Sequence, residues 1–345
     1  MYDYEDEDED MFGTPKPKKS EVGIDFKSEL NSDQFQAVTA PFGPALVLAG
    51  AGSGKTRTLT YRVAYLLSQG VSPEEILLLT FTNKASKQML GRVEELTGVS
   101  SHRFLGGTFH HVGGQVLRLF GDSIGLPRNF TILDDADSDA LLSEVIRDLD
   151  PGFFKSKENP KAKPIKGIIS FSRNVMVPVE DVAKGRYPSN SELLATIDSF
   201  MRDYQDTKIR RGLADYDDLL VLWLQVLETN KEAARYYQER FSHILVDEYQ
   251  DVNSLQSKIV DKIAANHQIM AVGDDAQCIY TWRGADIDQI LGFPERHPGT
   301  KIFKIETNYR SSPEILKFAN GILENRKTSE NFTKTLKPSQ PHQDL

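Results

Sequence analysis

The sequence predicts an α/β fold, in which a mainly helical subdomain is inserted into a domain with a mostly parallel sheet. The first observation is a series of short apolar runs, each ending in a cluster of polar residues, with helical segments between them. The second is that the earliest run leads directly into a glycine-rich turn and then a helix. This alternation is typical of folds that bind ligands at the carboxyl ends of parallel strands. The predicted strands are Ala45–Leu48, Ile76–Thr80, His243–Asp247, Gln268–Gly273 and Lys301–Glu306.

The composition is that of a soluble globular protein, with 39% hydrophobic and 26% charged residues in a chain of 345 residues. Because this length exceeds one ordinary core, we expect two or three domains. No apolar run approaches the roughly 20 residues that cross a bilayer, so we expect no membrane partner. The single cysteine, Cys278, excludes an internal disulfide and indicates a cytoplasmic location. The net charge of −9 does not indicate a nucleic-acid binder, so such a prediction must rest on local motifs.

The chain divides into segments of different character. Residues 1–10 are mostly acidic and are followed by a cluster of lysines and prolines, so we expect residues 1–25 to be a disordered tail. Between the second and third predicted strands the chain is mainly helical, for example at Ser138–Leu149 and Ser191–Tyr204. The expected division is an α/β domain of residues 26–111 and 206–311, a helical insertion of residues 112–205, and a linker from residue 312 to residue 345.

The glycine-rich turn has the pattern of a P-loop. A strand precedes it, residues 57–67 after it have apolar side chains at helical spacing, and only its first position, Ala49, departs from the strict pattern. In a P-loop, glycines let several backbone N–H groups converge on phosphate oxygens at a helix N-terminus. Lys55 is expected to reach the β- and γ-phosphates of ATP, and the Thr56 hydroxyl to bind Mg²⁺. The predicted phosphate-binding residues are Ala49, Gly50, Ala51, Gly52, Ser53, Gly54, Lys55 and Thr56.

Two adjacent carboxylates follow the third predicted strand. In a P-loop enzyme, Asp247 would contribute to the Mg²⁺ shell, and Glu248 would orient or deprotonate the attacking water. An Asp-Glu pair after a strand is weak evidence alone. Together with an upstream P-loop it indicates nucleotide hydrolysis.

Several motifs, in order along the chain, resemble those of superfamily 1 helicases of the UvrD/Rep/PcrA type. Besides the P-loop, these motifs are Leu30–Ala37, Thr80–Ala85, Gly107–His110, Asp247–Asp251, Val272–Ala285 and Glu306–Ser311. The resemblance covers residues 28–320. It implies a RecA-like P-loop NTPase domain that hydrolyses ATP with Mg²⁺ and moves 3′→5′ on single-stranded or tailed duplex DNA.

The resemblance also assigns roles around the nucleotide. Gln34 would read the adenine edge, while Arg57 and Tyr309 would pack against the base. Gln277 would sense the γ-phosphate, and Arg310 would stabilise charge on the transferring phosphoryl group.

On the DNA side, the resemblance implies that Phe81, Tyr280 and Trp282 stack on bases, with Arg283 as a nearby ionic link. The alternative is that these aromatic residues belong to the core, and for Phe81 and Phe109 the sequence leaves both possibilities open. The predicted strand-contacting residues are Phe81, Thr82, Asn83, Thr108, His110, Tyr280, Trp282 and Arg283.

In the family the resemblance indicates, two RecA-like domains enclose ATP, and the sequence ends at Leu345, shortly after the last motif. We therefore expect residues 312–345 to begin a second motor domain that a downstream segment or a second chain supplies. Three functions are compatible with these motifs: the front half of a helicase motor, a stand-alone module that binds nucleotide and single-stranded DNA without unwinding, and a P-loop NTPase outside nucleic-acid metabolism. Exposed aromatic residues beside a γ-phosphate sensor argue against the third.

Overall fold

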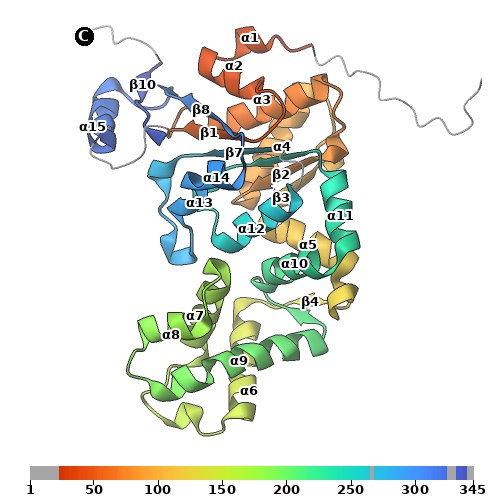
Figure 1. The fold of residues 1–345 in the computed structure, drawn as a ribbon, viewed down its shortest axis with the longest axis vertical. Coiled ribbons are helices and arrows are strands. Elements are labelled where there is room, and N and C mark those ends of the chain that lie inside the picture. The colour runs from red at the N-terminus through yellow and green to blue at the C-terminus, as the bar shows by residue number, and fades with distance from the viewer. Residues whose placement is uncertain (1–22, 265–267, 325–331, 340–345) are drawn as a thin grey trace, which may run out of the picture.

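The computed structural model of the protein describes residues 23–264, 268–324 and 332–339. Its centre is a parallel sheet of six strands in the order β3-β2-β6-β7-β1-β8 (Figure 1). The strands are β1 (Ala45–Ala49), β2 (Ile76–Thr80), β3 (Leu105–Thr108), β6 (His243–Val246), β7 (Ile269–Gly273) and β8 (Lys301–Ile305). The prediction of an α/β fold with a parallel sheet is confirmed. Residues 1–22 of the predicted tail lie outside the described residues, as do residues 325–331 and 340–345 of the predicted linker.

All five predicted strands are present, and the sequence analysis missed the sixth, β3. This strand consists of Leu105, two glycines and Thr108, so Thr108 is its one residue of the β-branched and aromatic types that favour strands, and glycine is depleted in strands. Close packing favours glycine at Gly107, because a Cβ there would lie 2.6 Å from the His111 ring, whereas one at Gly106 would lie 3.3 Å from the Leu90 side chain.

Apolar side chains point to both faces of the sheet, and helices cover both. Successive residues of a strand alternate between faces, so Leu46 and Leu48 lie in one core while Val47 lies in the other. The face with Val47 is covered by α2 (Ser32–Val38), α3 (Lys55–Ser68) and α4 (Asn83–Thr97). The opposite face is covered by α5 (Phe109–Phe120), α10 (Asp218–Thr229), α11 (Lys231–Arg240), α12 (Ser254–Ile263), α13 (Ile287–Leu291) and α14 (Phe293–Arg296).

The inserted segment forms a helical lobe away from the sheet (Figure 1). Its helices are α6 (Asp135–Leu149), α7 (Ala162–Val175), α8 (Val179–Arg186) and α9 (Ser191–Arg210). They bury a core of their own around Leu142, Phe153, Ile165 and Phe200. The two predicted example helices lie inside α6 and α9. The predicted domain boundaries at residues 111 and 205 fall within α5 and α9, so the exact division of domains stays a prediction.

A buried cluster of charges joins the lobe to the sheet domain beside the short parallel pair β4 (Thr131–Ile132) and β5 (Leu213–Ala214). Lys208 Nζ lies 2.5 Å from Asp215 Oδ2 and 2.6 Å from Asp218 Oδ2. Tyr204 donates its hydroxyl to Asp215, and Arg173 of α7 pairs with Asp218 at 3.3 Å. Burial and the charge of Asp215 raise the pKa of Asp218 above its usual range. These contacts hold α7 in a defined position relative to α10.

The C-terminal described segments pack beside the nucleotide-binding turn. β9 (Thr307–Asn308) pairs with β10 (Lys337–Pro338), and α15 (Pro313–Glu324) lies next to them (Figure 1). A short helix, α1 (Phe26–Glu29), precedes α2 at the other end of the chain. Among the described residues, every helix is too short or too polar to cross a lipid bilayer.

Candidate nucleotide and nucleic-acid site

The turn between β1 and α3 is shaped to hold phosphate. Gly52 and Gly54 have φ of 77° and 90°, the left-handed region that favours glycine. A Cβ at Gly52 would lie 2.6 Å from Arg310 Cβ, and one at Gly54 would lie 2.7 Å from Gln34 Nε2. Since α3 begins at Lys55 without a side-chain cap, its first N–H groups are directed at the turn.

Lys55 and Glu248 meet beside this turn. The Lys55 side chain is 9% exposed, and its Nζ lies 2.6 Å from Glu248 Oε2. The ammonium has no hydrogen bond of good geometry to any described residue. A buried cation with unused donors fits a bound phosphate.

The carboxylates after β6 fit a bound cation. Asp247 is buried, and this burial together with the charge of Glu248 raises its pKa to about 7. Glu248 has φ 49°, one of the two left-handed residues other than glycine among those described. No group of three or more His, Cys, Asp or Glu side chains that could hold a metal occurs in the described part of the chain. A magnesium ion would therefore depend on Asp247, Thr56 and the oxygens of a bound phosphate.

The residues predicted to surround the nucleotide base lie at the same turn. Gln34 donates to Ser53 O at 3.0 Å, and Tyr309 N donates to Gly52 O at 2.9 Å. The exposed Tyr309 hydroxyl accepts a hydrogen bond from Asn31 at 2.7 Å. Their roles in reading the base stay predictions.

Arg57 and Asn308 complete the surroundings of the turn. Arg57 is held by Glu29, with its guanidinium 4.6 Å from the ring centre of Tyr61. The sequence analysis did not single out Asn308, although it lies in the motif Glu306–Ser311. Its side chain donates to Ala51 O and accepts from Arg310 N at 2.9 Å, so it fixes Arg310 beside the P-loop.

A hydrogen-bonded path leads from Glu248, which lies beside the P-loop, to the loop after β7. Gln250 Nε2 donates to Glu248 Oε2 at 2.8 Å, and Gln250 Oε1 accepts from Asp274 N at 2.9 Å. Asp274 Oδ2 in turn accepts from Gln277 Nε2 at 2.6 Å. Glu248, the predicted general base, is therefore connected to Gln277, the predicted γ-phosphate sensor. The connection runs through Gln250 and Asp274, to which the sequence analysis assigned no role.

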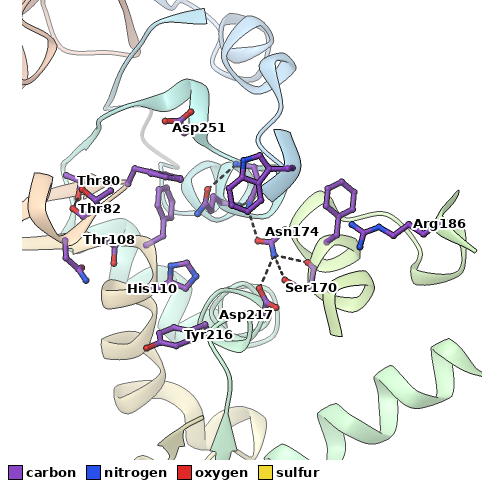
Figure 2. Close-up of a pocket in the computed structure, with 18 residues that line it drawn as sticks. Thr80, Thr82, Thr108, His110, Ser170, Asn174, Arg186, Tyr216, Asp217 and Asp251 are labelled. Atoms are coloured by element: carbon purple, nitrogen blue, oxygen red, sulfur yellow. Dashed lines mark hydrogen bonds between the residues drawn. The ribbon is translucent and has the colours of Figure 1, made fainter. Parts of the chain in front are cut away.

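A groove of about 680 Å³ lies between the sheet domain and the helical lobe. Figure 2 shows Thr80, Thr82, Thr108 and His110 on one side, and Ser170, Asn174 and Arg186 on the opposite side. Most of the predicted strand-contacting residues line it, namely Phe81, Thr82, Asn83, Thr108, His110 and Trp282.

Phe81 and Trp282 line this groove, and Tyr280 packs beside both of them without lining it. The ring centroids of Phe81 and Tyr280 are 5.3 Å apart, and those of Tyr280 and Trp282 are 6.4 Å apart. Trp282 is 65% exposed, so it is not a core residue. Phe109, for which the sequence left both possibilities open, is buried in the core of the sheet domain.

Arg283 is the last residue of the 3₁₀ turn Thr281–Arg283, and its side chain is outside the described part of the structure. Tyr216 lines the groove with an exposed ring 6.2 Å from the ring of His110, and sequence analysis missed it. Its signal was an aromatic residue between two aspartates, just before an apolar helix.

The fold and the site define a P-loop nucleotide-binding protein in which one loop joins the phosphate site to an aromatic groove. The description "UvrD/REP helicase N-terminal domain" belongs to a family model that matches residues 30–298, and the chain belongs to this family. The resemblance seen in the motifs is thus confirmed.

Two curated relatives agree with this assignment. The ATP-dependent DNA helicase PcrA of Staphylococcus epidermidis is 41% identical over 302 residues, which are 85% of this chain and 40% of the relative. The protein of the same name from Staphylococcus aureus is 38% identical over 302 residues, 86% of this chain and 40% of the relative. The chain therefore spans about two fifths of the length of these relatives.

Proposed function

We propose that the chain is the front half of an ATP-dependent 3′→5′ DNA helicase or translocase motor. The observation that carries the proposal is the loop after β7, because it reaches both parts of the site. Gln277 of this loop is bound to Asp274 in the path from Glu248, and Trp282 lines the groove. A loop with one end at a phosphate and the other at a nucleic-acid base can transmit hydrolysis to strand binding.

In the proposed reaction, Lys55 neutralises charge on the β- and γ-phosphates of ATP. Glu248 accepts the proton of the attacking water once the phosphate has drawn Lys55 away from it. Gln277 and Arg310 contact the γ-phosphate, and Arg310 stabilises the charge of the transferring group. Thr56 and Asp247 would hold Mg²⁺, which would screen the phosphate charge.

In the groove, Phe81, Tyr280 and Trp282 are proposed to stack on successive bases of single-stranded DNA. Stacking suits a motor, because every base has an aromatic face and the contact does not depend on sequence. The polarity of movement, 3′→5′, comes from the family resemblance alone.

The second RecA-like domain is proposed to cover α15. This helix exposes Ile315, Phe318 and Ile322, which are spaced to lie on one face. The exposed apolar face lies beside Arg310, which is also exposed. This supports the proposal that a second motor domain packs on α15 and closes over the nucleotide.

The first test measures ATP hydrolysis by the 345-residue chain with and without oligothymidine. We expect stimulation by single-stranded DNA and its loss in Glu248→Gln. The absence of both nucleotide and DNA binding by the folded wild-type chain would contradict the proposal.

The second test separates the helicase from the alternative, a module that binds nucleotide and DNA without unwinding. Strand displacement is measured on 3′-tailed and 5′-tailed duplexes, with the chain alone and with the second motor domain of a relative added. The helicase proposal predicts displacement from the 3′ tail when the second domain is present. The module alternative predicts binding without displacement in every arm.

A further inference from the structure

We propose that Lys334 is a positioning residue that holds Gln277 in place through Asp274. The inference rests on the proposed function, because Gln277 is the proposed γ-phosphate sensor. Lys334 belongs to none of the family motifs recognised in the sequence, and it follows Asp274 by 60 residues.

Lys334 is a buried cation between two buried carboxylates. Its side chain is 3% exposed, and its Nζ lies 2.5 Å from Asp274 Oδ1 and also contacts Asp275 Oδ1. Both aspartates are likewise buried. Two adjacent carboxylates in such a place repel each other unless a cation lies between them.

Asp274 belongs both to this ion pair and to the hydrogen-bonded path from Glu248 to Gln277. Its Oδ2 accepts from Gln277 Nε2 at 2.6 Å, while its Oδ1 accepts from Ala276 N at 3.0 Å and contacts Lys334. The orientation of the carboxylate is therefore shared between Lys334 and Gln277. If Lys334 is removed, Oδ1 keeps only the backbone hydrogen bond from Ala276 and loses its charged partner. The carboxylate is then held less firmly, so Gln277 loses a fixed acceptor.

The segment that carries Lys334 is itself held at several points. Thr335 N donates to Glu306 Oε1 at 2.8 Å, and the backbone of Leu336 exchanges two hydrogen bonds with the side chain of Asn320. The Leu336 side chain lies over the P-loop, since a Cβ at Gly50 would be 2.5 Å from it. The segment that carries the Lys334 ammonium therefore also packs on the phosphate-binding turn.

The test compares Lys334→Met with Lys337→Met. Lys337 lies on the same segment but is exposed and pairs with Glu306 at 2.7 Å, away from Asp274. Titration calorimetry with a non-hydrolysable ATP analogue and with ADP gives the preference for the triphosphate. Because a hydrogen bond to a charged group is lost, we expect Lys334→Met to reduce this preference about tenfold or more. We expect Lys337→Met to leave it within about twofold.

A variant pair shows whether Lys334 acts through Gln277. If it does, Lys334→Met has no further effect on the preference in a Gln277→Ala background, because coupled residues are not additive. If the double variant instead loses the product of the two single-variant fold-changes in triphosphate preference, the two residues act independently and the inference is overturned. A lower melting temperature with an unchanged preference would also overturn it, since that result indicates a purely structural ion pair.

Circular dichroism shows whether Lys334→Met folds. If it does not, Asp274→Asn provides the same test. The amide keeps the shape but removes the charge that pairs with Lys334, and its single oxygen cannot accept both from Gln277 and from the donors on the other side, Lys334 and Ala276. An unchanged triphosphate preference in Asp274→Asn would overturn the inference. A wild-type chain that binds neither nucleotide would instead overturn the proposed function, and this inference with it.

Discussion

Replacing Trp282 with alanine tests the nucleic-acid side of the site. Trp282 is 65% exposed, so only about a third of an indole surface of roughly 250 Å² is removed from water by the protein. At about 25 cal/mol per Å², this burial stabilises the fold by at most about 2 kcal/mol. A base stacked on the indole adds about 1–3 kcal/mol to binding, so Trp282→Ala is expected to weaken single-stranded DNA binding by roughly 5- to 150-fold.

The matched control is Trp223, the other tryptophan of the chain, which is fully buried in the core of the sheet domain. Truncating it to alanine is expected to cost about 3–5 kcal/mol of stability. In a Trp223→Phe background, Trp282 is the only tryptophan, so quenching of its fluorescence by oligothymidine reports stacking directly.

Binding is measured as fluorescence anisotropy of labelled oligothymidine at one fixed salt concentration, and stability by urea denaturation. ATP affinity is expected to stay nearly constant in Trp282→Ala. The stacking argument is refuted if Trp282→Ala keeps wild-type DNA affinity. It is equally refuted if the variant loses as much stability as Trp223→Ala.

Three further changes probe the nucleotide site and the core. Lys55→Ala is expected to abolish Mg·ATP binding in a calorimeter while the chain stays folded, because the ammonium is needed at the phosphates. Glu248→Gln is expected to retain ATP binding and lose hydrolysis, because an amide cannot accept the proton of water. Burial, and then the charge of Arg62, lower the pKa of His243 to about 4. His243 therefore binds a proton more tightly in the unfolded chain than in the folded one. As the pH drops from about 6.5 to about 4, the free energy of unfolding should fall by about 3 kcal/mol.

Each of these expectations has an outcome that contradicts it. Unchanged nucleotide affinity in Lys55→Ala would contradict the P-loop assignment. ATP turnover within a few-fold of wild type in Glu248→Gln would show that Glu248 is not the general base. For the pH dependence, the control is His243→Gln, measured by urea denaturation across the same range. An equally steep loss of stability in that variant would show that other groups cause it.

The sequence predicted those parts of the fold and site that depend on local pattern. The strand with Leu46 and Leu48 is apolar on both faces and is followed by a glycine turn, so both the strand and the P-loop are readable within a dozen residues. Strand β3 could not be predicted, because two of its four residues are glycines, which are depleted in strands, and the close approach of His111 to Gly107 is visible only in the structure.

Contacts between distant segments were also beyond prediction. Asn308 bonds to Ala51 across 257 residues, and Lys334 reaches Asp274 across 60 residues. Neither residue has a local pattern that reveals its partner. The same holds for Tyr216, because its place on the groove follows from how the helical lobe is attached.

The order of strands in the sheet has a consequence for synthesis of the chain. β1 lies between β7 and β8, which are made last among the strands of the central sheet. The ribosome must add roughly 220 residues after β1 before β7 is complete, which takes about 10–45 s at about 5–20 residues per second. During this time the apolar strand that leads into the P-loop has neither hydrogen-bonded neighbour. The nascent chain is therefore exposed to aggregation at this strand, and a chaperone that binds short apolar segments would be of most use there.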